Sequence, residues 1–497
     1  MSSRKWLAIA ALVLATLAVG LDLTVLNLAL PTLSVALHAS TSDLQWFLNA
    51  YTLVLGAVLL PAGMIGDRFG RKRTLMAALV LFGLGSLACA YSTSPAMLIA
   101  ARAFLGVGAA FIIPLSLAVV PVMFTDEERP RTIAVLMVAS LLAFPIGPIL
   151  GGFLLTHYWW GSVFLINVPV AFIGLAAVWT LLPESRGQEA SHIDVIGILL
   201  SSAGMVALSY GVIDAGQNGW GGPTALGAMA LGCLLLTVFF LWERRAAAPL
   251  VDLDLFRSAG FTWGTVLATI VSFAMFGVLF AVPQYFQEIR GETAFTSGIR
   301  LLPLIGGLII GAAVATRLRD RTGTKLSVAL GYALLAGGLG LSARTTPASG
   351  FSFTTLWMAV SGLGLGFAMP TAMDAAIGAL NRERSASGTS LIQAVRQVGA
   401  TLGVGILGSV VDSGYRTEVP VHGLPAALAH TVRESVAAGV IAARRLGSPA
   451  LLAAVRQAFV HSMDGMLLIC GGIAAAGIVL ALAVLPRRER PAPGGAP

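Results

Sequence analysis

The chain has 497 residues, of which 57% are hydrophobic and only 11% are charged. Soluble domains carry about 25% charged residues, so charge this sparse cannot cover a water-exposed surface of this size. Apolar runs of about 18 residues or more recur along the chain and indicate an integral membrane protein. The net charge of +8 then requires no nucleic-acid partner, because basic residues at helix ends set the orientation of a chain in the bilayer.

The cysteines lie inside apolar segments, and the histidines fall in loops or at segment ends. This placement favours packing roles and predicts no disulfide framework, no metal site and no cofactor. The apolar run that follows Arg4 and Lys5 has no small-residue cleavage site and is too long for a signal peptide. It is therefore predicted to be the first membrane span.

The sequence predicts an all-α membrane protein with fourteen spans, at residues 6–30, 44–65, 74–92, 95–120, 133–156, 160–182, 193–214, 223–243, 259–284, 297–316, 326–343, 352–376, 387–411 and 463–485. Lysine and arginine gather on one side of this topology, and the short loops on the other side hold only Arg290 and Arg344. The positive-inside rule then predicts a multi-pass protein with both termini in the cytoplasm. The Ala/Gly/Arg-rich composition favours a bacterial source, so we expect a bacterial cytoplasmic membrane.

Polar links divide these spans into three groups. We predict an N-terminal six-helix bundle at 1–183, an inserted two-helix segment at 184–255 and a C-terminal six-helix bundle at 256–486. The Pro/Gly-rich tail at 487–497 is predicted to be disordered. A long outer loop at 412–462 contains two amphipathic stretches, 424–446 and 449–461, which form either an outer lid or a passive connection.

The first span ends in the stretch Leu21–Pro31, which places the carboxylate of Asp22 among apolar residues. A charge at bilayer depth costs roughly 2.5 kcal/mol or more, so it usually faces a partner or a watery cavity. Burial also makes a carboxyl group easier to protonate. Asp22 is therefore predicted to carry a proton, the alternative being a structural Asp held by neighbouring donors. Asn27 in the same stretch is predicted to face a substrate.

The strongest motif joins spans two and three by a very short turn at residues 63–73. Its glycines permit the tight backbone and its charged residues anchor the membrane face, so we expect a conformational role for Gly63, Gly66, Asp67, Arg68, Gly70 and Arg71. A weaker echo stands at 318–325, between spans ten and eleven. An echo at the matching place indicates internal duplication, which is typical of rocker-type carriers.

With these motifs in hand, the chain resembles the fourteen-span drug:proton antiporters of the major facilitator superfamily. Residues 63–73 are similar to the superfamily's signature between helices two and three, and Leu21–Pro31 resembles the first-helix motif. Arg102–Gly108 resembles the motif whose arginine is linked to proton transfer. The antiporter signature of span five is matched by Gly147, Pro148, Gly151 and Gly152. Residues 164–169 and 388–399 also fit the family.

Some residues depart from the family pattern. Ala143 stands where the antiporter signature usually has glycine, and Pro145 adds a second kink. Relatives that expel bulky cations carry further acids in spans two, ten and thirteen. Here span two has Asn49 and span thirteen has Gln393 and Gln397, which disfavours export of polyvalent cations.

Two pairs of buried charges are predicted to couple protons to transport. Asp22 and Arg102 both lie about 10–13 Å below the outer surface, at 1.5 Å per residue. The resemblance implies that their helices pack side by side, so the two side chains are expected to meet. In the second half, Asp374 and Arg396 form a pair if the long arginine side chain reaches towards the inner end of its span. The alternative for this second pair is a structural lock between two helices.

The substrate is predicted to contact polar and aromatic side chains inside the bundle. Gln393, Arg396 and Gln397 share one helical face, which lipid would not tolerate. Phe273 and Phe276 belong to an aromatic stripe that suits an apolar pocket, although such stripes also serve in packing or face lipid. Asn49 completes the predicted contacts.

These features predict a secondary transporter, not an enzyme: a monomeric proton antiporter that exports lipophilic or amphiphilic drugs or antibiotics. The alternatives are a dedicated exporter of a self-made metabolite and a proton symporter that imports a nutrient. ATP-driven export is disfavoured because the sequence has no phosphate-binding Gly-x-x-x-x-Gly-Lys motif. A sensor or an intramembrane enzyme is disfavoured because no nucleophile–base or metal-ligand cluster lies at bilayer depth.

Overall fold

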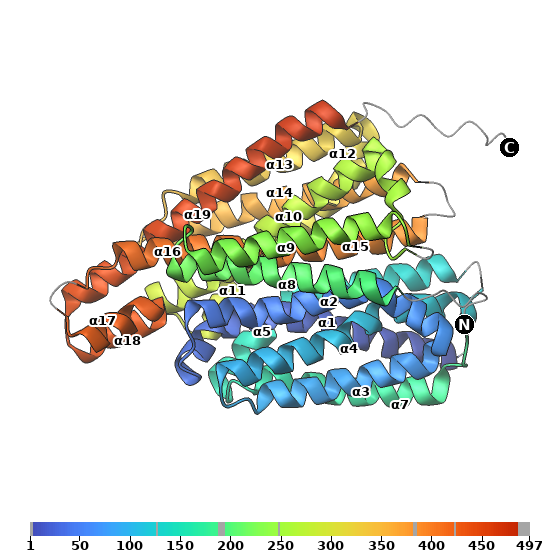
Figure 1. Cartoon of the computed structure of the whole chain (residues 1–497), viewed down its shortest axis with the longest axis horizontal. Helices are drawn as coiled ribbons and strands as arrows, with labels where there is room; N and C mark the ends of the chain where they lie inside the picture. The colour runs from blue at the N-terminus through green and yellow to red at the C-terminus, as the bar shows by residue number, and fades with distance from the viewer. Residues whose placement is uncertain are drawn as a thin grey trace.

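The computed structural model of the chain describes residues 3–125, 128–186, 194–246, 249–380, 385–421 and 424–485. Within these ranges the regular structure is entirely helical, and long helices lie side by side along one common direction (Figure 1). The start of the first described helix and the end of the last one lie at the same end of the bundle, which we call the terminal end. The predicted tail at 487–497 and most of the link at 183–192 fall outside the described residues.

The first group of helices runs from the N-terminus to residue 181. It comprises α1 (Ser3–Ala36), α2 (Thr41–Phe69), α3 (Arg71–Ala90), α4 (Pro95–Met123), α5 (Arg129–His157), α6 (Ser162–Leu165) and α7 (Asn167–Leu181). A hairpin of two helices follows, α8 (Val195–Asn218) and α9 (Pro223–Glu243), and the short 3₁₀ turn η1 (Leu253–Arg257) leads into the second group.

The second group begins with α10 (Ala259–Gln284), which continues into the π-helical turn η2 (Tyr285–Ile289). The helices that follow are α11 (Ala294–Arg300), α12 (Leu302–Thr322), α13 (Thr324–Ser342), α14 (Phe351–Gly378), α15 (Ser385–Leu402), the π-helical turn η3 (Gly403–Leu407), α16 (Gly408–Glu418), α17 (Ala426–Glu434), α18 (Val436–Arg445) and α19 (Pro449–Val484).

The two groups repeat the same packing pattern. In the first group α4 packs against α2 and α3, and α3 also packs against α7. In the second group α14 packs against α12 and α13, and α13 also packs against α19. The tight turns correspond as well, because Gly70 (φ 106°) ends α2 and Gly323 (φ 84°) ends α12. Only glycine adopts such dihedrals without strain. This repetition agrees with the predicted internal duplication.

The predicted number of fourteen spans is not confirmed. Each predicted segment coincides with a helix or with consecutive helices, of which 387–411 covers three, α15, η3 and part of α16. In the described part of the chain, twelve helices are long and apolar enough to cross a membrane, or thirteen if the bent α2 is one span. α2 bends by 55° between Thr41–Leu59 and Pro61–Phe69. In α5 only Leu142–His157 qualifies as apolar helix, and it is shorter than a span.

The predicted outer loop at 412–462 is shorter than expected. α16 continues the preceding span to Glu418, and α19 already begins at Pro449 and runs for 36 residues into the bundle. The sequence predicts a separate surface helix at residues 449–461. The structure corrects this, because these residues are the start of the last long helix. The other amphipathic stretch forms α17 and α18. Together these helices project beyond the rest of the bundle at the end opposite the termini (Figure 1).

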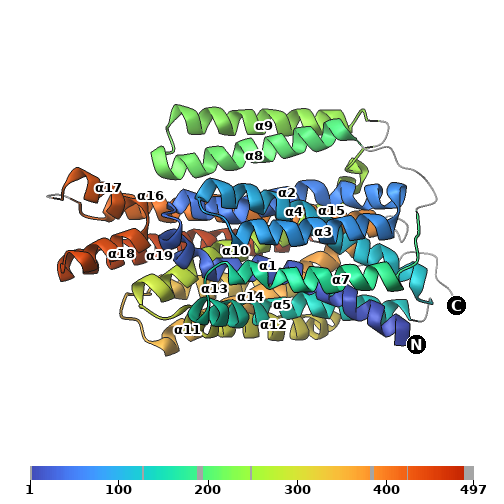
Figure 2. The same cartoon turned by 90° about the horizontal axis from the view of Figure 1, so that it is seen from below.

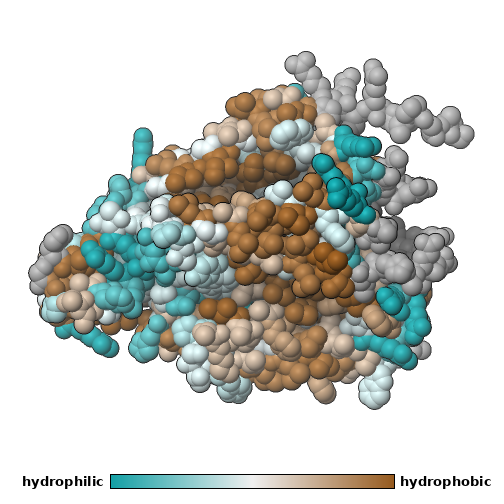
Figure 3. Space-filling view, in the orientation of Figure 1, coloured by the Kyte–Doolittle hydropathy of each residue, from teal (hydrophilic) through white to brown (hydrophobic). Residues whose placement is uncertain are grey.

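The inserted hairpin lies on one side of the bundle. α8 packs against α2 of the first group and α16 of the second, while α9 packs mainly against α8 (Figure 2). Large apolar side chains on the outer faces of both helices are exposed, including Leu199, Leu231 and Leu234. The surface over this region is correspondingly hydrophobic (Figure 3). An apolar surface of this kind suits contact with lipid, as the sequence predicts.

Close helix packing gives a prediction about stability. A Cβ added at Gly338 of α13 would lie 2.6 Å from the backbone nitrogen of Ser361 in α14, whereas one at Gly340 would meet nothing within 4 Å. We expect Gly338→Val to destabilise the protein by about 1–3 kcal/mol through overpacking. Gly340→Val is the matched control on the same helix and should unfold like the wild type. Thermal unfolding in detergent, followed by tryptophan fluorescence, measures both; equal midpoints would contradict the packing.

Candidate functional site

A buried ion pair joins the first and fourth helices. Arg102 on α4 donates a hydrogen bond from Nη1 to Asp22 Oδ2 on α1, and each side chain is only 1% exposed. The Arg102 Nε also donates to the carbonyl oxygen of Phe47 on α2 at 2.9 Å. Asn167 at the start of α7 lies with its Nδ2 3.4 Å from Asp22 Oδ1. The expected meeting of Asp22 and Arg102 is confirmed, and four helices converge on it.

Aromatic rings enclose the guanidinium group. The Arg102 Cζ lies 4.3 Å from the centre of the Tyr51 ring and 6.0 Å from that of Phe164. Ring faces attract a cation, most strongly where water is absent. Removing one partner of such a buried pair leaves an uncompensated charge, which typically costs about 3–5 kcal/mol. Protonation of the carboxylate would have a related effect, because it removes the negative charge and leaves the guanidinium in place.

The second predicted pair is not formed as expected. Asp374 on α14 makes its ion pair with Arg319, near the end of α12. Both side chains are partly exposed, at 40% and 33% respectively. Arg319 belongs to the echo motif at 318–325, so Asp374 holds a turn at the terminal end of the second group. The long arginine of α15 does not reach it because it turns towards α10.

Arg396 is anchored by uncharged groups. Its Nη1 donates to Gln393 Oε1 at 2.5 Å and its Nε donates to Ser272 Oγ on α10 at 3.2 Å. Gln397 points elsewhere, since a Cβ added at Gly56 of α2 would lie 3.3 Å from Gln397 Cγ. The predicted polar face of α15 is therefore divided between α10 on one side and α2 on the other.

The remaining predicted substrate contacts are buried at different places. Asn27 donates from Nδ2 to the carbonyl of Leu23 at 2.9 Å. Asn49 is fully buried and, among the described residues, both its amide atoms lack hydrogen-bond partners. Phe276 is buried on α10, and Phe273 is half-buried three residues before it. None of the six residues predicted to bind substrate lines the apolar cavity that lies between α2, α8, α9 and α15.

The motif between α2 and α3 ties several elements together at the terminal end. The Arg71 Nε donates to Asp67 Oδ1 at 2.7 Å, and its Nη1 donates to the carbonyl of Ala118 on α4 at 3.0 Å. The backbone nitrogen of Lys72 donates to Glu184 Oε1 at 3.1 Å, just after α7. Arg68 is exposed, with its Cζ 5.6 Å from the Phe69 ring. The motif thus fixes the turn against α4 and the end of the first group.

Two motif glycines differ in how closely they pack. Gly66 allows the side chain of Leu115 on α4 to come into direct contact with α2, because a Cβ at this position would collide with it. A Cβ at Gly63 would meet nothing within 4 Å. Close approach therefore explains Gly66, while the structure gives no packing reason for Gly63.

The small residues of α5 face both groups of helices. A Cβ added at Gly147 would lie 2.9 Å from Thr24 Cβ, and one at Gly151 would lie 2.7 Å from Val25 Cγ1, both on α1. A Cβ at Gly152 would instead lie 2.7 Å from the carbonyl oxygen of Ala294, at the start of α11 in the second group. Gly147 and Gly151 therefore let α1 approach α5, and Gly152 lets the second group approach it.

The proline and alanine of the same signature take part in this contact. Gly298 of α11 packs directly on the carbonyl of Pro148, so that a Cβ at Gly298 would collide with it. Ala143, which departs from the usual glycine of the antiporter signature, accepts a hydrogen bond at its carbonyl from Thr24 Oγ1 at 3.3 Å. The departure from the family pattern thus leaves the α1–α5 contact in place.

Three hydrogen bonds join the two groups at the end opposite the termini. The Gln287 Nε2 donates to the carbonyl of Leu28 at 2.9 Å. The hydroxyl oxygens of Ser34 and Ser435 lie 3.2 Å apart, and the Thr41 hydroxyl donates to the carbonyl of Glu434 at 3.1 Å. The segment between α17 and α18 therefore rests on the turn between α1 and α2 and connects the two groups at this end.

Sequence reasoning missed some polar residues of this interior. Asn167 falls in the motif at 164–169, which the sequence identified, but its contact with Asp22 depends on how α7 packs. Asp412, expected at the start of a loop, is 2% exposed inside α16, and Arg416 Nε donates to its Oδ2 at 3.0 Å. The i, i+4 spacing of these opposite charges is the pattern that could have indicated a continuing helix.

The sequence pattern of the Major Facilitator Superfamily matches residues 12–404. The chain belongs to the Major Facilitator Superfamily. It is therefore a transporter-family protein with many membrane-spanning helices, in agreement with the resemblance noted from its motifs.

Relatives of this major facilitator protein are named for resistance and export. It is 32% identical to the tetracenomycin C resistance and export protein of Streptomyces glaucescens, over 98% of this chain and 93% of that protein. It is 30% identical to a methyl viologen resistance protein of Salmonella typhimurium, over 98% and 100%. The puromycin resistance protein of Streptomyces alboniger is 31% identical, over 88% and 89%.

Solved structures with the same fold are more distant in sequence. A bacterial homolog of the human lysosomal transporter Spinster, in an inward-facing and unoccupied conformation, is 15% identical with a TM-score of 0.72. The match covers 99% of this chain and all of that one. A D-xylose–proton symporter is 14% identical with a TM-score of 0.63, covering 98% and 99%. These matches establish the major facilitator fold.

The corrected ion pair can be tested by a double-mutant cycle. Asp374→Asn and Arg319→Gln should be less than additive in thermal stability, with a coupling of about 0.2–1 kcal/mol because both side chains are partly exposed. Asp374→Asn combined with Arg396→Gln is the matched comparison and should be additive. The reverse result, coupling to Arg396 and none to Arg319, would restore the pair expected from the sequence.

Proposed function

We propose that this protein is a proton-coupled antiporter that exports lipophilic or amphiphilic drugs or antibiotics across the cytoplasmic membrane. The single observation that carries the proton coupling is the fully buried pair of Asp22 and Arg102. A carboxylate held at this depth is costly unless its charge is paired or neutralised. Export of drugs is supported by the names of relatives that span nearly the whole chain.

In the proposed cycle, Asp22 gains a proton from one side of the membrane and loses it to the other. With Asp22 charged, the ion pair holds α1 against α4, and Phe47 adds α2 to the same cluster. Protonation removes the attraction between the two side chains, so α1 is less firmly held. α1 packs on α5 through Thr24 and Val25, and α5 packs on α11 of the second group. The proton therefore acts on a helix that contacts the second half directly through Leu28 and Ser34 and also packs on α5, a second helix of the contact between the halves.

The proposed carrier is a monomer whose halves, residues 1–183 and 256–486, rock about the substrate. The positive-inside rule favours a cytoplasmic terminal end, because the basic motif at 63–73 and its echo both lie there. Three hydrogen bonds between the halves then lie on the outer side, near Leu28, Ser34 and Thr41, while the contact of Thr52 with Thr401 lies deeper along α2. This arrangement supports a state closed to the outside. Proton and substrate drive the exchange only by binding the two states with different affinity.

A dedicated exporter of one antibiotic is a second candidate, since several relatives are named for resistance to a single compound. This candidate shares the coupling mechanism and differs only in how many compounds the protein accepts. A resistance screen in a strain that lacks its own pumps separates the two. A dedicated exporter protects against one compound, and a multidrug carrier protects against several unrelated ones.

Replacing the proposed proton site should abolish coupling. We expect Asp22→Asn to lower substrate-triggered proton release from everted vesicles to the level of empty vesicles, because an amide cannot exchange a proton at physiological pH. The substrate is a compound identified by the resistance screen, beginning with puromycin. Asp22→Glu retains a titratable group and should retain measurable release.

Two controls keep this result interpretable. Asp254→Asn removes a carboxylate whose side chain is 57% exposed and should behave like the wild type. Gel filtration of each purified variant establishes that it folds. If folded Asp22→Asn protein still exported its substrate in exchange for protons, the assignment of Asp22 would be wrong.

The contact between the halves gives a test of rocking. Because the hydroxyls of Ser34 and Ser435 lie 3.2 Å apart, cysteines at both positions should form a disulfide under mild oxidation in a Cys233→Ser background. The bond would hold the outer side closed, so export should stop and return on reduction. Either single cysteine variant is the matched control. Full export by the oxidised double variant would show that these residues need not separate during transport.

A further inference from the structure

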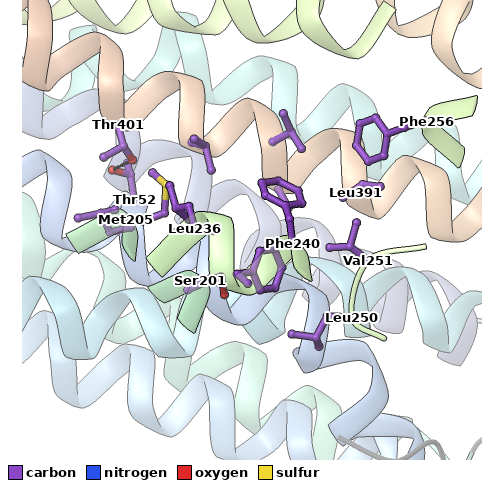
Figure 4. A pocket seen from close by; sticks show the side chains of 17 residues that line it. Thr52, Ser201, Met205, Leu236, Phe240, Leu250, Val251, Phe256, Leu391 and Thr401 are labelled. Atoms are coloured by element: carbon purple, nitrogen blue, oxygen red, sulfur yellow. Dashed lines mark hydrogen bonds between the residues drawn. The ribbon is translucent and has the colours of Figure 1, made fainter. Parts of the chain in front are cut away.

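An apolar cavity of about 290 Å³ lies where the two halves and the inserted hairpin meet (Figure 4). Its wall comes from α2 and α15, which belong to different halves, from α8 and α9, and from the segment that leads into α10. Side chains that face this space include Thr52, Thr401, Ser201, Met205, Leu236 and Phe240.

Among the residues that the structure describes, those lining the cavity include no ionisable side chain. Its hydroxyl groups are already hydrogen-bonded: the oxygens of Thr52 and Thr401 lie 2.8 Å apart, and Ser201 donates to the carbonyl of Gly197 at 2.8 Å. Thr52 and Thr401 also lie within hydrogen-bonding distance of carbonyls of their own helices. A charged group placed here would lose its hydration without gaining a partner, which is strongly unfavourable. The cavity therefore suits an uncharged, apolar occupant.

The size of the cavity limits what it can hold. A dry cavity of about 150 Å³ lined by Leu, Ile and Phe binds benzene. A volume of about 290 Å³ is larger, so it has room for a fused ring system or a length of alkyl chain.

The cavity adjoins the surface that faces lipid. Phe240 lines it and is nevertheless 49% exposed. On the same helix, Leu234 and Leu241 are 59% and 53% exposed on the apolar outer face of the hairpin. A lipophilic molecule dissolved in the bilayer can therefore reach the rim without crossing a polar surface.

The position between α2 and α15 couples the cavity to the arrangement of the halves. The contact of Thr52 with Thr401 crosses from one half to the other at the edge of the cavity. A ligand that touches both helices favours the state in which they have this spacing. An occupant would therefore influence transport even if it were not itself carried.

From these observations we infer that this cavity binds the uncharged apolar part of a molecule taken sideways from the bilayer, with α8 and α9 as its wall on the lipid side. The inference rests on the proposed function where the occupant is an exported compound. The acyl chain of a phospholipid has the same chemistry and is the second source. The inferred role for the inserted hairpin is thus to complete a binding site between the halves.

Photo-cross-linking of the full chain in nanodiscs tests this inference. The probe is a phosphatidylcholine with a diazirine in its acyl chain, and uncharged N-phenyl-1-naphthylamine serves as competitor. Labelled peptides are mapped by mass spectrometry. We expect labelling on cavity-lining residues of α2, α8, α9 and α15. Ser201→Phe and Met205→Trp should each lower it about tenfold, which corresponds to ~1.4 kcal/mol.

Matched controls lie on the same helix. Ala203→Phe and Val206→Trp add equally large side chains at exposed positions of α8 and should leave labelling of the cavity unchanged. Gel filtration identifies variants that misfold. Ser201→Phe and Met205→Trp, the two filling variants, are independent of each other, so the test remains decisive if one of them does not fold. Labelling that spreads evenly over the exposed faces of α8 and α9, and that neither filling variant changes, would overturn the inference.

Competition separates the two sources of the occupant. If the naphthylamine lowers labelling of the cavity, the site accepts free lipophilic compounds. If the naphthylamine has no effect while the filling variants abolish labelling, the site holds an acyl chain. The assay needs no proton gradient, so it is independent of Asp22. Loss of the proposed antiport with labelling intact would refute only the function, and loss of labelling with antiport intact would refute only this site.

Discussion

The mutual dependence of Asp22 and Arg102 is the constraint around which the first half is built. Both side chains are almost completely buried, so each charge depends on the other as its partner. The geometry that satisfies them also recruits a carbonyl from α2 and an amide from α7. Helices that would otherwise slide on apolar surfaces are thereby held at one relative height. The ion pair that protonation of Asp22 would weaken is therefore also the contact that holds α1, α2, α4 and α7 together.

Small residues transmit this constraint to the contact between the halves. α5 has glycines on two faces, where neighbouring helices approach its backbone closely. Gly147 and Gly151 face α1, and Gly152 faces α11. Without a hydrophobic driving force between helices in lipid, close backbone packing of this kind determines which helices associate. Few rotamers are open to the side chains at this contact, because the β-branched Thr24 and Val25 pack directly on the glycines of α5. We therefore expect a movement of α1 at the ion pair to be passed on to α5 and to the contact between the halves.

Much of this arrangement could be predicted from the sequence, and the errors have identifiable physical causes. The depth of Asp22 and Arg102 follows from helix rise, and the family resemblance implies that their helices are neighbours, so their meeting was predictable. The partner of Asp374 was not predictable, because the sequence does not show in which direction the side chains of Arg319 and Arg396 point. In the structure Arg319 points to Asp374, and Arg396 points to Ser272. The ends of α16 and α19 were misplaced since polar residues in their outer turns resemble a loop.

The apolar cavity could not be predicted from the sequence for a similar reason. Its lining comes from four helices and a connecting segment, and the residues on each helix read as ordinary lipid-facing or packing positions. The polar residues predicted to meet substrate lie elsewhere in the bundle. A binding site made of apolar surface is defined by how helices are spaced, and spacing is a property that periodicity within one helix cannot reveal.

The helices that project opposite the termini have a practical consequence. α16, α17, α18 and the first turns of α19 form a compact polar knob outside the apolar belt. Most of the remaining surface would be covered by a detergent micelle or nanodisc, which gives a 51.3 kDa protein few landmarks for image alignment. An antibody fragment raised against the knob would supply such a landmark. Because the knob touches the first half through Ser435, the fragment would also report whether that contact is made.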